Sequence, residues 1–348
     1  MHDGETGMRV TSPAPRDAWL EVANADPQSF IYQTPAGFDA ICATFNANDA
    51  SRLYEFPDGR KLVLPLFRQR GLPNFLTADR SPLIGSLIAP GPVRKQELQA
   101  IFADLARNPV LRTVVRPTAL GSAAWIDAAP KDWIKVKCRS HVLDLDGGFE
   151  TVWKNRFNNQ ARRGVRKAEK SGLEIETDDS GKLVPVFYEL LERSIERWAA
   201  TRKEPLAFAR WRARRRDPIE KIEGLAAALG SAFRIWLARV DGEPAAAIIV
   251  LSGANAHYTR GAMDISLAGP TRASFLLQKL AIEEACNSGC LYYNMGETGT
   301  SETLARFKQH FGAQAYSYVE YRHERFPLTR IEAWLRRLAE KIIMRGGK

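Results

Sequence analysis

The apolar residues along this chain recur with two periods, and the period predicts whether a segment forms a strand or a helix. Between residues 52 and 67, two apolar-rich runs flank Pro57-Asp58-Gly59, which is typical of a β-hairpin. Over 95–108 the apolar residues recur every three or four positions, as on one face of an amphipathic helix. Strands are expected after it, at 111–117 and 133–147.

The second half of the chain has a more regular pattern. Three apolar-rich segments between 233 and 264 are separated by the turn sequences DGEP and SGAN, which predicts three successive antiparallel strands. A helix with a basic surface is expected before them, over 149–172, and Gly172 stands where a helix C-cap glycine belongs. The remaining expected elements are a strand at 173–178, helices at 183–199, 219–230 and 272–289, a strand at 290–296, a helix at 302–312 and a strand at 314–322.

The two ends of the chain differ from this pattern. Residues 1–28 contain acidic residues and no apolar h-region of a secretory signal, so we expect a flexible N-terminal leader. Residues 326–348 are expected to form a C-terminal amphipathic helix, with an apolar face that includes Ile331 and Trp334. Packing of this face on the protein is favoured over contact with a membrane surface, and a peripheral membrane contact stays open.

Composition places the chain among globular, soluble proteins of ordinary size. It has 348 residues, of which 45% are hydrophobic and 26% charged, and this length favours two domains. No apolar run approaches the roughly 20 residues that a membrane-spanning helix needs. The four cysteines lack the spacing of a disulfide framework or a zinc site, so we expect reduced thiols and a cytoplasmic protein without a metal.

Positive charge is concentrated in two segments. The formal net charge is +10, and 153–172 carries seven basic residues against one acidic residue. A second basic segment spans 193–221 and includes the sequence RWRARRRD. Such clusters attract the phosphate groups of nucleic acids, nucleotides or lipids, although a solvated helix face would have the same composition. Charge alone leaves both interpretations open.

One lysine stands out in the segment YYNMGETGTSETLARFKQHFG, which spans 292–312. The segment contains a predicted strand, a loop of Gly, Thr and Ser, and a predicted helix in which Lys308 lies between Phe307 and Phe311. By itself this pattern is typical of a helix lysine whose aliphatic stem packs on apolar neighbours while its charge reaches water. No Ser-His-Asp or Cys-His motif for covalent catalysis is evident in the sequence.

The order of the expected elements is similar to that of a known acyltransferase fold. Three antiparallel strands, a helix, a strand, a helix and a strand form the core of the GNAT fold. Three segments resemble the Fem-type aminoacyltransferases in more detail, namely FNNQARRGVRKAEKSGLEIE (157–176), YTRGAMD (258–264) and YYNMGETG with ARFKQHFGA (292–313). They look like that family's basic helix, its Tyr-x-x-Gly strand, and its strand, glycine loop and FKxxFG element. The resemblance is good over 150–322 and weak over the first half.

This resemblance implies a mixed α/β (α+β) fold of two tandem GNAT-like domains, with mostly antiparallel sheets flanked by helices. The first domain is expected over 29–150 and the second over 151–325, between the leader and the C-terminal helix. The implied activity is transfer of an aminoacyl group from aminoacyl-tRNA to an amine of a cell-wall precursor or a natural product. No cofactor is implied, because the activated donor is itself a substrate.

Two other functions remain open. The acetyl-CoA pyrophosphate signature of typical GNAT enzymes is missing, because 265–275 contains Gly269, Pro270 and Arg272 in its place. Its loss removes backbone N–H donors at a helix start, which argues against an ordinary acetyltransferase. An acyl-CoA-dependent N-acyltransferase acting on a polysaccharide, lipid or small-molecule amine is the first alternative. A non-catalytic module that binds RNA or another anion is the second.

Amide formation from an aminoacyl ester needs a neutral amine, an activated carbonyl and a place for the oxyanion. By family resemblance Lys308 points toward the aminoacyl end of the tRNA, where a cation would stabilise that oxyanion. Asp264 and Glu297 follow strands of the matched core and are the carboxylates expected to accept the proton of the amine. Alternatively they are a turn residue and a loop residue, and the substrate itself assists the proton transfer.

Substrate contacts are expected from the same motifs. Tyr258 and Arg260 alternate along one strand and are expected to face the same side, where they would hold a phosphate or carboxylate of the acceptor. A cross-strand pair on a solvated face is the alternative. The full set of expected substrate-binding residues is Tyr258, Arg260, Asn294, Thr298 and Phe307.

Contacts to tRNA are expected from the two basic segments. The basic helix would contact the phosphate backbone, and aromatic residues of the second segment would stack on unpaired 3′-terminal bases. Trp198 lies on an amphipathic helix face and is expected in the core instead. The expected tRNA-binding residues are Arg162, Arg163, Arg166, Lys167, Trp211, Arg214 and Arg215.

Overall fold

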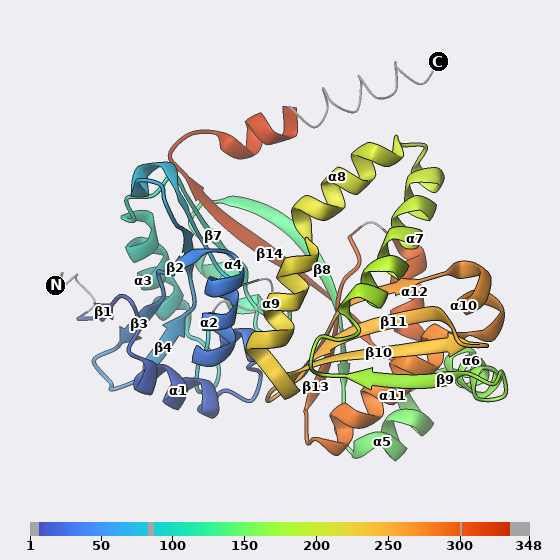
Figure 1. The fold of residues 1–348 in the computed structure, drawn as a ribbon. Helices are drawn as coiled ribbons and strands as arrows, with labels where there is room; N and C mark the ends of the chain where they lie inside the picture. The colour runs from blue at the N-terminus through green and yellow to red at the C-terminus, as the bar shows by residue number, and fades with distance from the viewer. Residues whose placement is uncertain (1–6, 83–86, 300, 335–348) are drawn as a thin grey trace.

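The computed structural model describes residues 7–82, 87–299 and 301–334. These residues form two halves that lie side by side, each with strands and helices (Figure 1). The first half contains β1 (Arg9–Thr11), α1 (Arg16–Ala25), η1 (Ile31–Gln33), α2 (Pro35–Thr44), β2 (Ala47–Asp49), β3 (Arg52–Glu55), β4 (Lys61–Leu64), β5 (Phe67–Gln69), η2 (Asn74–Leu76), β6 (Ala78–Arg80), α3 (Lys95–Ala106), β7 (Arg112–Val115), α4 (Ala123–Ala128) and β8 (Ile134–Asp144).

The second half follows directly. It contains α5 (Gly148–Thr151), the π-helical turn η3 (Val152–Arg156), α6 (Asn159–Glu169), β9 (Glu174–Asp178), α7 (Val184–Arg202), α8 (Leu206–Arg216), α9 (Ile219–Leu229), η4 (Gly230–Ala232), β10 (Phe233–Val240), β11 (Glu243–Leu251), β12 (Ala256–Met263), α10 (Ile265–Thr271), α11 (Ala273–Asn287), β13 (Tyr292–Glu297), α12 (Glu302–His310) and β14 (Gln314–Glu324).

A single sheet connects the two halves. Its eleven strands have the order β2-β5-β6-β7-β14-β8-β13-β12-β11-β10-β9, and a separate small sheet contains β1, β3 and β4. Adjacent strands are antiparallel except for two parallel pairs, β6 with β7 and β12 with β13. The predicted mixed α/β fold with mostly antiparallel sheets is confirmed.

The two halves repeat one succession of elements. In each, a parallel crossover (β6-α3-β7 or β12-α11-β13) is followed by a helix and a last strand, which is β8 or β14. The last strands are exchanged, because β14 lies next to β7 and β8 lies next to β13. β8 and β14 also pair with each other, from Val142–Gln314 to Ile134–Arg322. The predicted domain boundary near residue 150 falls after β8, although the sheet continues across both halves.

The second half has a core on each face of the sheet. Ile248 and Val250 of β11 enter the core beneath α6 and α11, whereas Ile249 and Leu251 enter the core beneath α7 and α9. A strand that is buried on both faces can be apolar at every position. This explains the unbroken apolar run at 245–251.

Residues 7–28 are folded, so the predicted flexible leader over 1–28 is wrong for this stretch. Trp19 of α1 is fully buried against Phe38 of α2, with ring centroids 5.1 Å apart. Its Nε1 donates to the carbonyl oxygen of Gln33 at 2.6 Å. The spacing of Trp19, Val22 and Ala23, all buried, is the sequence signal for this helix. Residues 1–6 lie outside the described residues.

The predicted helix over 149–172 is divided in two. The π-helical turn η3 ends at Arg156, and Asn158 starts α6 by accepting a hydrogen bond from the Ala161 amide at 3.0 Å. An Asn at this position satisfies an amide that the first turn of a helix leaves free. Helices also form where none was predicted at α8 and α10 in this half, and at α2 and α4 in the first half.

The predicted C-terminal helix over 326–348 is described only in its first part. Residues 328–334 are helical, and Ile331 and Trp334 are exposed. Residues 335–348 lie outside the described residues. Within the described ranges, no helix combines the length and the apolar character needed to cross a membrane.

Gly312 provides a test of how the loop before β14 is held. Its φ is +86°, and a Cβ there would lie 2.5 Å from the backbone oxygen of Arg156. We expect Gly312→Ala to lower the free energy of unfolding by about 2–4 kcal/mol, because it adds a backbone clash to the cost of a positive φ. Urea denaturation measures this loss.

Gly59 is the matched control for this substitution. Its φ is +80°, and a Cβ there would meet nothing within 4 Å. Gly59→Ala should therefore cost only the backbone term of about 1–2 kcal/mol. Equal losses for the two variants would contradict a close approach of Gly312 to Arg156.

Candidate active site

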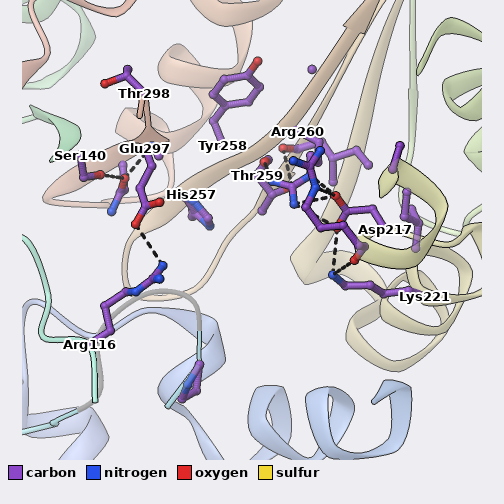
Figure 2. Close-up of a pocket in the computed structure, with 18 of the residues that line it drawn as sticks. Arg116, Ser140, Asp217, Lys221, His257, Tyr258, Thr259, Arg260, Glu297 and Thr298 are labelled. Carbon is purple, nitrogen blue, oxygen red and sulfur yellow. Dashed lines mark hydrogen bonds and ion pairs between the residues drawn. The ribbon is translucent and has the colours of Figure 1, made fainter. Parts of the chain in front are cut away.

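A cleft of about 1830 Å³ lies between the two halves and is lined by residues of both. It opens where β12 and β13 separate. These parallel strands pair at Ala256–Tyr293 and His257–Asn294, and in the described residues no pairing continues toward Met263 and Glu297. Backbone groups on the facing edges of the two strands are therefore left for a substrate. Figure 2 shows residues around this opening.

Asn294 shapes the end of β13. Its buried Oδ1 accepts hydrogen bonds from the Ser140 hydroxyl at 3.1 Å and from the Gly296 amide at 2.7 Å. Gly296 has a φ of +74°, and the pairing of β13 with β8 shifts register between Asn294 and Glu297. The predicted substrate-binding residue Asn294 thus lines the cleft and also holds the Gly296 turn.

Lys308, predicted to be a catalytic residue, is buried at the cleft. It lies on α12 and is only 2% exposed. Its side chain lines the cleft beside the turn at the end of β13. Its Nζ donates to the carbonyl oxygens of Gly296 at 2.9 Å and of Glu297 at 3.0 Å. Burial lowers the pKa of Lys308 to about 7, against the opposing charge of Glu297. An ammonium has three N–H donors, so one remains for a ligand.

Two buried histidines stand near this lysine. Burial and the charges of Lys308 and Arg139 lower the pKa of His141 to about 4. Burial and the charges of Arg260 and Lys308 hold the pKa of His257 well below its ordinary value. Both imidazoles are therefore uncharged at neutral pH. His257 lines the cleft.

Glu297 is connected to the first half. Its Oε1 accepts hydrogen bonds from Arg116 Nη1 at 3.0 Å and from the Tyr318 hydroxyl, and Arg116 Nε also donates to Glu320 at 3.0 Å. Figure 2 shows the Glu297 side chain directed toward Arg116. Both donors therefore occupy the same carboxylate oxygen. Glu297 thus lines the cleft beside Lys308 but is bound to other residues.

Asp264 lies apart from this cluster. It caps α10, accepting hydrogen bonds from Ser266 N at 2.8 Å and from Ser266 Oγ, and it also accepts from Arg193 at 2.8 Å. These bonds lower the pKa of Asp264. It is not among the residues that line the cleft. The structure gives Asp264 the alternative considered above, a residue that starts a turn.

Tyr258 and Arg260 face opposite sides of the sheet, so the prediction that they share a side is wrong. Val250 pairs with Tyr258 and Ile249 with Arg260, which leaves Thr259 as the extra residue of a β-bulge. Tyr258 packs on the core beneath α6 and α11, whereas Arg260 points toward α8 and α9 (Figure 2). A bulge interrupts the two-residue alternation on which the prediction relied.

Arg260 is tied to an ion network rather than free for a ligand. Its Nε and Nη2 donate to Asp217 at 2.8–3.0 Å, and Lys221 Nζ donates to the same carboxylate at 2.9 Å. Burial of Asp217 raises its pKa, but Arg260 and Lys221 outweigh this effect and lower it to about 2. Figure 2 shows this network on the other side of the cleft from Glu297.

Thr298 and Phe307, also predicted to bind substrate, line the cleft near Lys308. Thr298 is buried, and its hydroxyl accepts a hydrogen bond from Arg139 Nε at 3.3 Å. The Phe307 ring packs edge-on against Phe275, with centroids 5.2 Å apart. Both residues shape the cleft wall around the lysine.

The predicted tRNA-binding residues of α6 lie outside the cleft. Arg163, Arg166 and Lys167 are exposed. Arg162 is engaged elsewhere, because its Nη1 donates to the carbonyl oxygens of Lys154 at 2.9 Å and Phe157 at 2.5 Å. Its guanidinium thus closes the end of the preceding turn.

The predicted tRNA-binding residues of α8 form an exposed basic and aromatic surface. Trp211 is 55% exposed, stacks with Phe208 and lies 5.7 Å from the guanidinium carbon of Arg215. Arg214 approaches Glu192 at 3.5 Å. The opposite side of α8 lines the cleft.

Sequence reasoning missed several residues of this site. Tyr32, Arg116 and Tyr318 line the cleft but come from η1, the segment after β7, and β14, so no short motif contains them. His257 directly precedes the YTRGAMD motif, and that position was the only available signal. In the described ranges, no group of three His, Cys, Asp or Glu residues could hold a metal ion.

Burial of Lys308 links stability to pH. Its pKa is about 7 in the folded protein, against 10.5 for an ordinary lysine. Between these values the unfolded chain binds a proton that the folded chain does not bind, so stability rises with pH. We expect the free energy of unfolding of the wild type, minus that of Lys308→Met, to rise by about 1 kcal/mol per pH unit between about pH 7 and pH 9.

Urea denaturation at several pH values measures this difference. Lys182→Met is the control, because Lys182 is exposed and does not line the cleft. Its difference from the wild type should not change with pH. A pH-independent difference for Lys308→Met would show that this lysine is not desolvated.

Part of the chain matches a known protein family. Residues 155–316 match the family described as acetyltransferase (GNAT) domain. No curated protein sequence matches the chain.

The structure is similar to FemX, with a TM-score of 0.66 at 12% identity, over 93% of this chain and 99% of that chain. It is also similar to a conserved protein of unknown function from Bacteroides thetaiotaomicron, with a TM-score of 0.56 at 11% identity, over 90% of this chain and 98% of that chain. The predicted resemblance is thus confirmed at the level of the fold: the chain has the GNAT-like fold of FemX, and its second half carries the match to the acetyltransferase domain.

Proposed function

We propose that this protein is an N-acyltransferase that moves an aminoacyl group from aminoacyl-tRNA to an amine. The observation that carries the proposal is Lys308, a buried cation at the point where β12 and β13 separate, beside a cleft shared by both halves. In the reaction, the amine nitrogen forms a bond to the ester carbonyl carbon while the carbonyl electrons move to its oxygen. The intermediate then expels the 3′-oxygen of the tRNA, which takes the proton that the amine loses.

Lys308 supports the first of these steps. In the protonated form of Lys308, two N–H groups are held by the Gly296 and Glu297 carbonyl oxygens, which leaves the third for the developing oxyanion. In a site of low dielectric, such a preorganised donor stabilises charge far more than it would in water. Glu297 and Asp264 are not needed in this scheme, since the leaving oxygen accepts the amine's proton.

The start of α11 supports a donor other than an acyl-CoA. The short helix α10, with Pro270 inside it, runs up to Arg272, whose φ is +59°, and α11 follows without a glycine loop. The Phe275 amide already donates to the Arg272 carbonyl oxygen at 2.9 Å. This arrangement offers few free amides for a pyrophosphate at that helix start.

The cleft and the basic surfaces are consistent with a large donor. The cleft volume of about 1830 Å³ exceeds the roughly 300–1,000 Å³ of ordinary small-molecule pockets. Arg163, Arg166 and Lys167 on α6 and the Trp211 surface of α8 supply exposed cations and an aromatic ring. We expect them to hold the phosphate backbone and an unpaired base, and we expect the reaction to take place in the cytoplasm, where charged tRNA occurs.

An acyl-CoA donor is the second candidate. The match of residues 155–316 to the acetyltransferase (GNAT) domain favours it. The chemistry at the carbonyl carbon would be the same, with a thiolate in place of the tRNA oxygen as leaving group. The amine acceptor would again be a polysaccharide, a lipid, a peptide precursor or a small molecule.

A transfer assay separates these candidates. The purified protein is incubated with tRNA charged with radiolabelled amino acids, or with labelled acyl-CoA, and with a panel of amine acceptors. We expect transfer from charged tRNA, and we expect Lys308→Met to reduce its rate by at least about 100-fold, as for loss of one oxyanion donor. Binding of charged tRNA to a filter should be unchanged in this variant.

Lys182→Met again serves as the control and should transfer at the wild-type rate. Turnover of acyl-CoA without any transfer from tRNA would replace the first candidate with the second. Transfer by Lys308→Met at the wild-type rate would remove the lysine from the mechanism.

A further inference from the structure

Because glycine has no side chain, Gly296 leaves a space near His257 Nε2 and Lys308 Nζ. A Cβ at this position would lie 3.6 Å from His257 Nε2, 3.9 Å from Lys308 Nζ and 3.3 Å from the Tyr258 carbonyl oxygen. Small movements of a ligand atom in this space would bring both nitrogens to hydrogen-bond distance. The space is part of the cleft, since Gly296, His257 and Lys308 all line it.

His257 is held in place from the first half of the chain. Its Nδ1 lies 3.3 Å from the Tyr32 hydroxyl, and the two rings meet edge-on with centroids 5.7 Å apart. Two residues before it, the Asn255 side chain donates to the carbonyl oxygens of Pro27 at 2.8 Å and Ser29 at 3.0 Å. The segment that carries Tyr32 is therefore fixed against the start of β12.

The contact with Tyr32 determines which nitrogen of His257 carries the proton. The Tyr32 hydroxyl is buried, and burial raises its pKa, so it keeps its proton. Among the described residues, His257 Nδ1 is the only hydrogen-bond partner of this hydroxyl. Because a buried O–H without an acceptor is costly, Tyr32 donates to Nδ1 and the ring proton lies on Nε2. The Nε2–H then faces the space at Gly296.

We propose that His257 and Lys308 together form the oxyanion site of this enzyme, at the space left by Gly296, with Tyr32 as the positioning residue. When the amine attacks, the carbonyl oxygen that gains the electron pair accepts hydrogen bonds from His257 Nε2–H and Lys308 Nζ–H. The intermediate then collapses, the bond to the donor oxygen breaks, and that oxygen takes the proton released by the amine. His257 keeps its own proton throughout, because an uncharged imidazole acts here as a donor.

This inference rests on the proposed acyl transfer, because it needs a carbonyl carbon that is attacked. It does not depend on whether the donor is a tRNA ester or an acyl-CoA, since both produce the same oxyanion. The Tyr258 carbonyl oxygen, 3.3 Å from the position of a Cβ at Gly296, would accept an N–H of the attacking amine.

Substitutions of His257 test its proposed role as a hydrogen-bond donor to the oxyanion. We expect His257→Leu to lower kcat about 100-fold with little change in KM, because the bond is formed only in the transition state. His257→Gln restores an N–H close to the Nε2 position and should recover at least about tenfold of that loss. His323→Leu is the control, because His323 lies on β14 against Trp133 and does not line the cleft. It should leave kcat unchanged.

Substitution of Gly296 tests the space itself. Gly296→Ala puts a methyl group at the point proposed for the oxyanion and should abolish most turnover. Gly299 in the same loop is the matched control, with a φ of +51° and nothing within 4 Å of a Cβ. Gly299→Ala carries a similar backbone strain and should retain turnover. Thermal melting of both variants checks that they fold.

The tautomer of His257 provides a readout that does not depend on activity. Nitrogen-15 NMR of the full chain should place the proton on Nε2 in the wild type, and Tyr32→Phe should shift the population toward Nδ1–H and lower kcat. A wild-type proton on Nδ1, or a wild-type kcat in His257→Leu, would overturn the proposal. If the wild type transfers an acyl group from neither aminoacyl-tRNA nor acyl-CoA, the proposed function fails and the oxyanion site fails with it. If the wild type transfers the acyl group and His257→Leu has the same kcat, only the proposed oxyanion site fails.

Discussion

The pairing of β8 with β14 is the interaction on which the rest of the structure depends. Each strand comes last in its own half, and each is bordered on its outer side by a strand of the other half, β13 or β7. Because backbone hydrogen bonds run along both edges of both strands, the two halves cannot slide past each other without breaking the ladder. Ser140 of β8 and Tyr318 and Glu320 of β14 therefore reach the cleft from a rigid floor.

The groups around Lys308 compensate part of the cost of burying its charge and respond to that charge. Burying an ammonium is unfavourable, and here two backbone carbonyl oxygens and a nearby carboxylate offset part of that cost. The adjacent imidazoles of His141 and His257 respond by remaining uncharged. Of these three side chains, Lys308 is the one whose pKa lies near neutrality.

The sequence predicted most strands and helices of the second half, because the two-residue and three-to-four-residue periods there are clear. Lys308 was found through its motif, and the structure places it at the cleft. The bulge at Thr259 could not be foreseen, because it breaks the alternation without a glycine or proline to mark it. Tyr32 and Arg116 were missed for another reason: they reach the site only through long-range pairing of the two halves, which local patterns do not encode.

The exchange of last strands also constrains the order of assembly during synthesis. Val115 of β7 pairs with Tyr321 of β14, so the first half cannot complete its sheet until β14 has been made. Contacts between residues so distant in sequence form late and slow folding. A nascent chain that lacks β14 would therefore present β7 and β8 as open edges and have no assembled cleft. The cleft between the two halves would then form only in molecules that already contain β14.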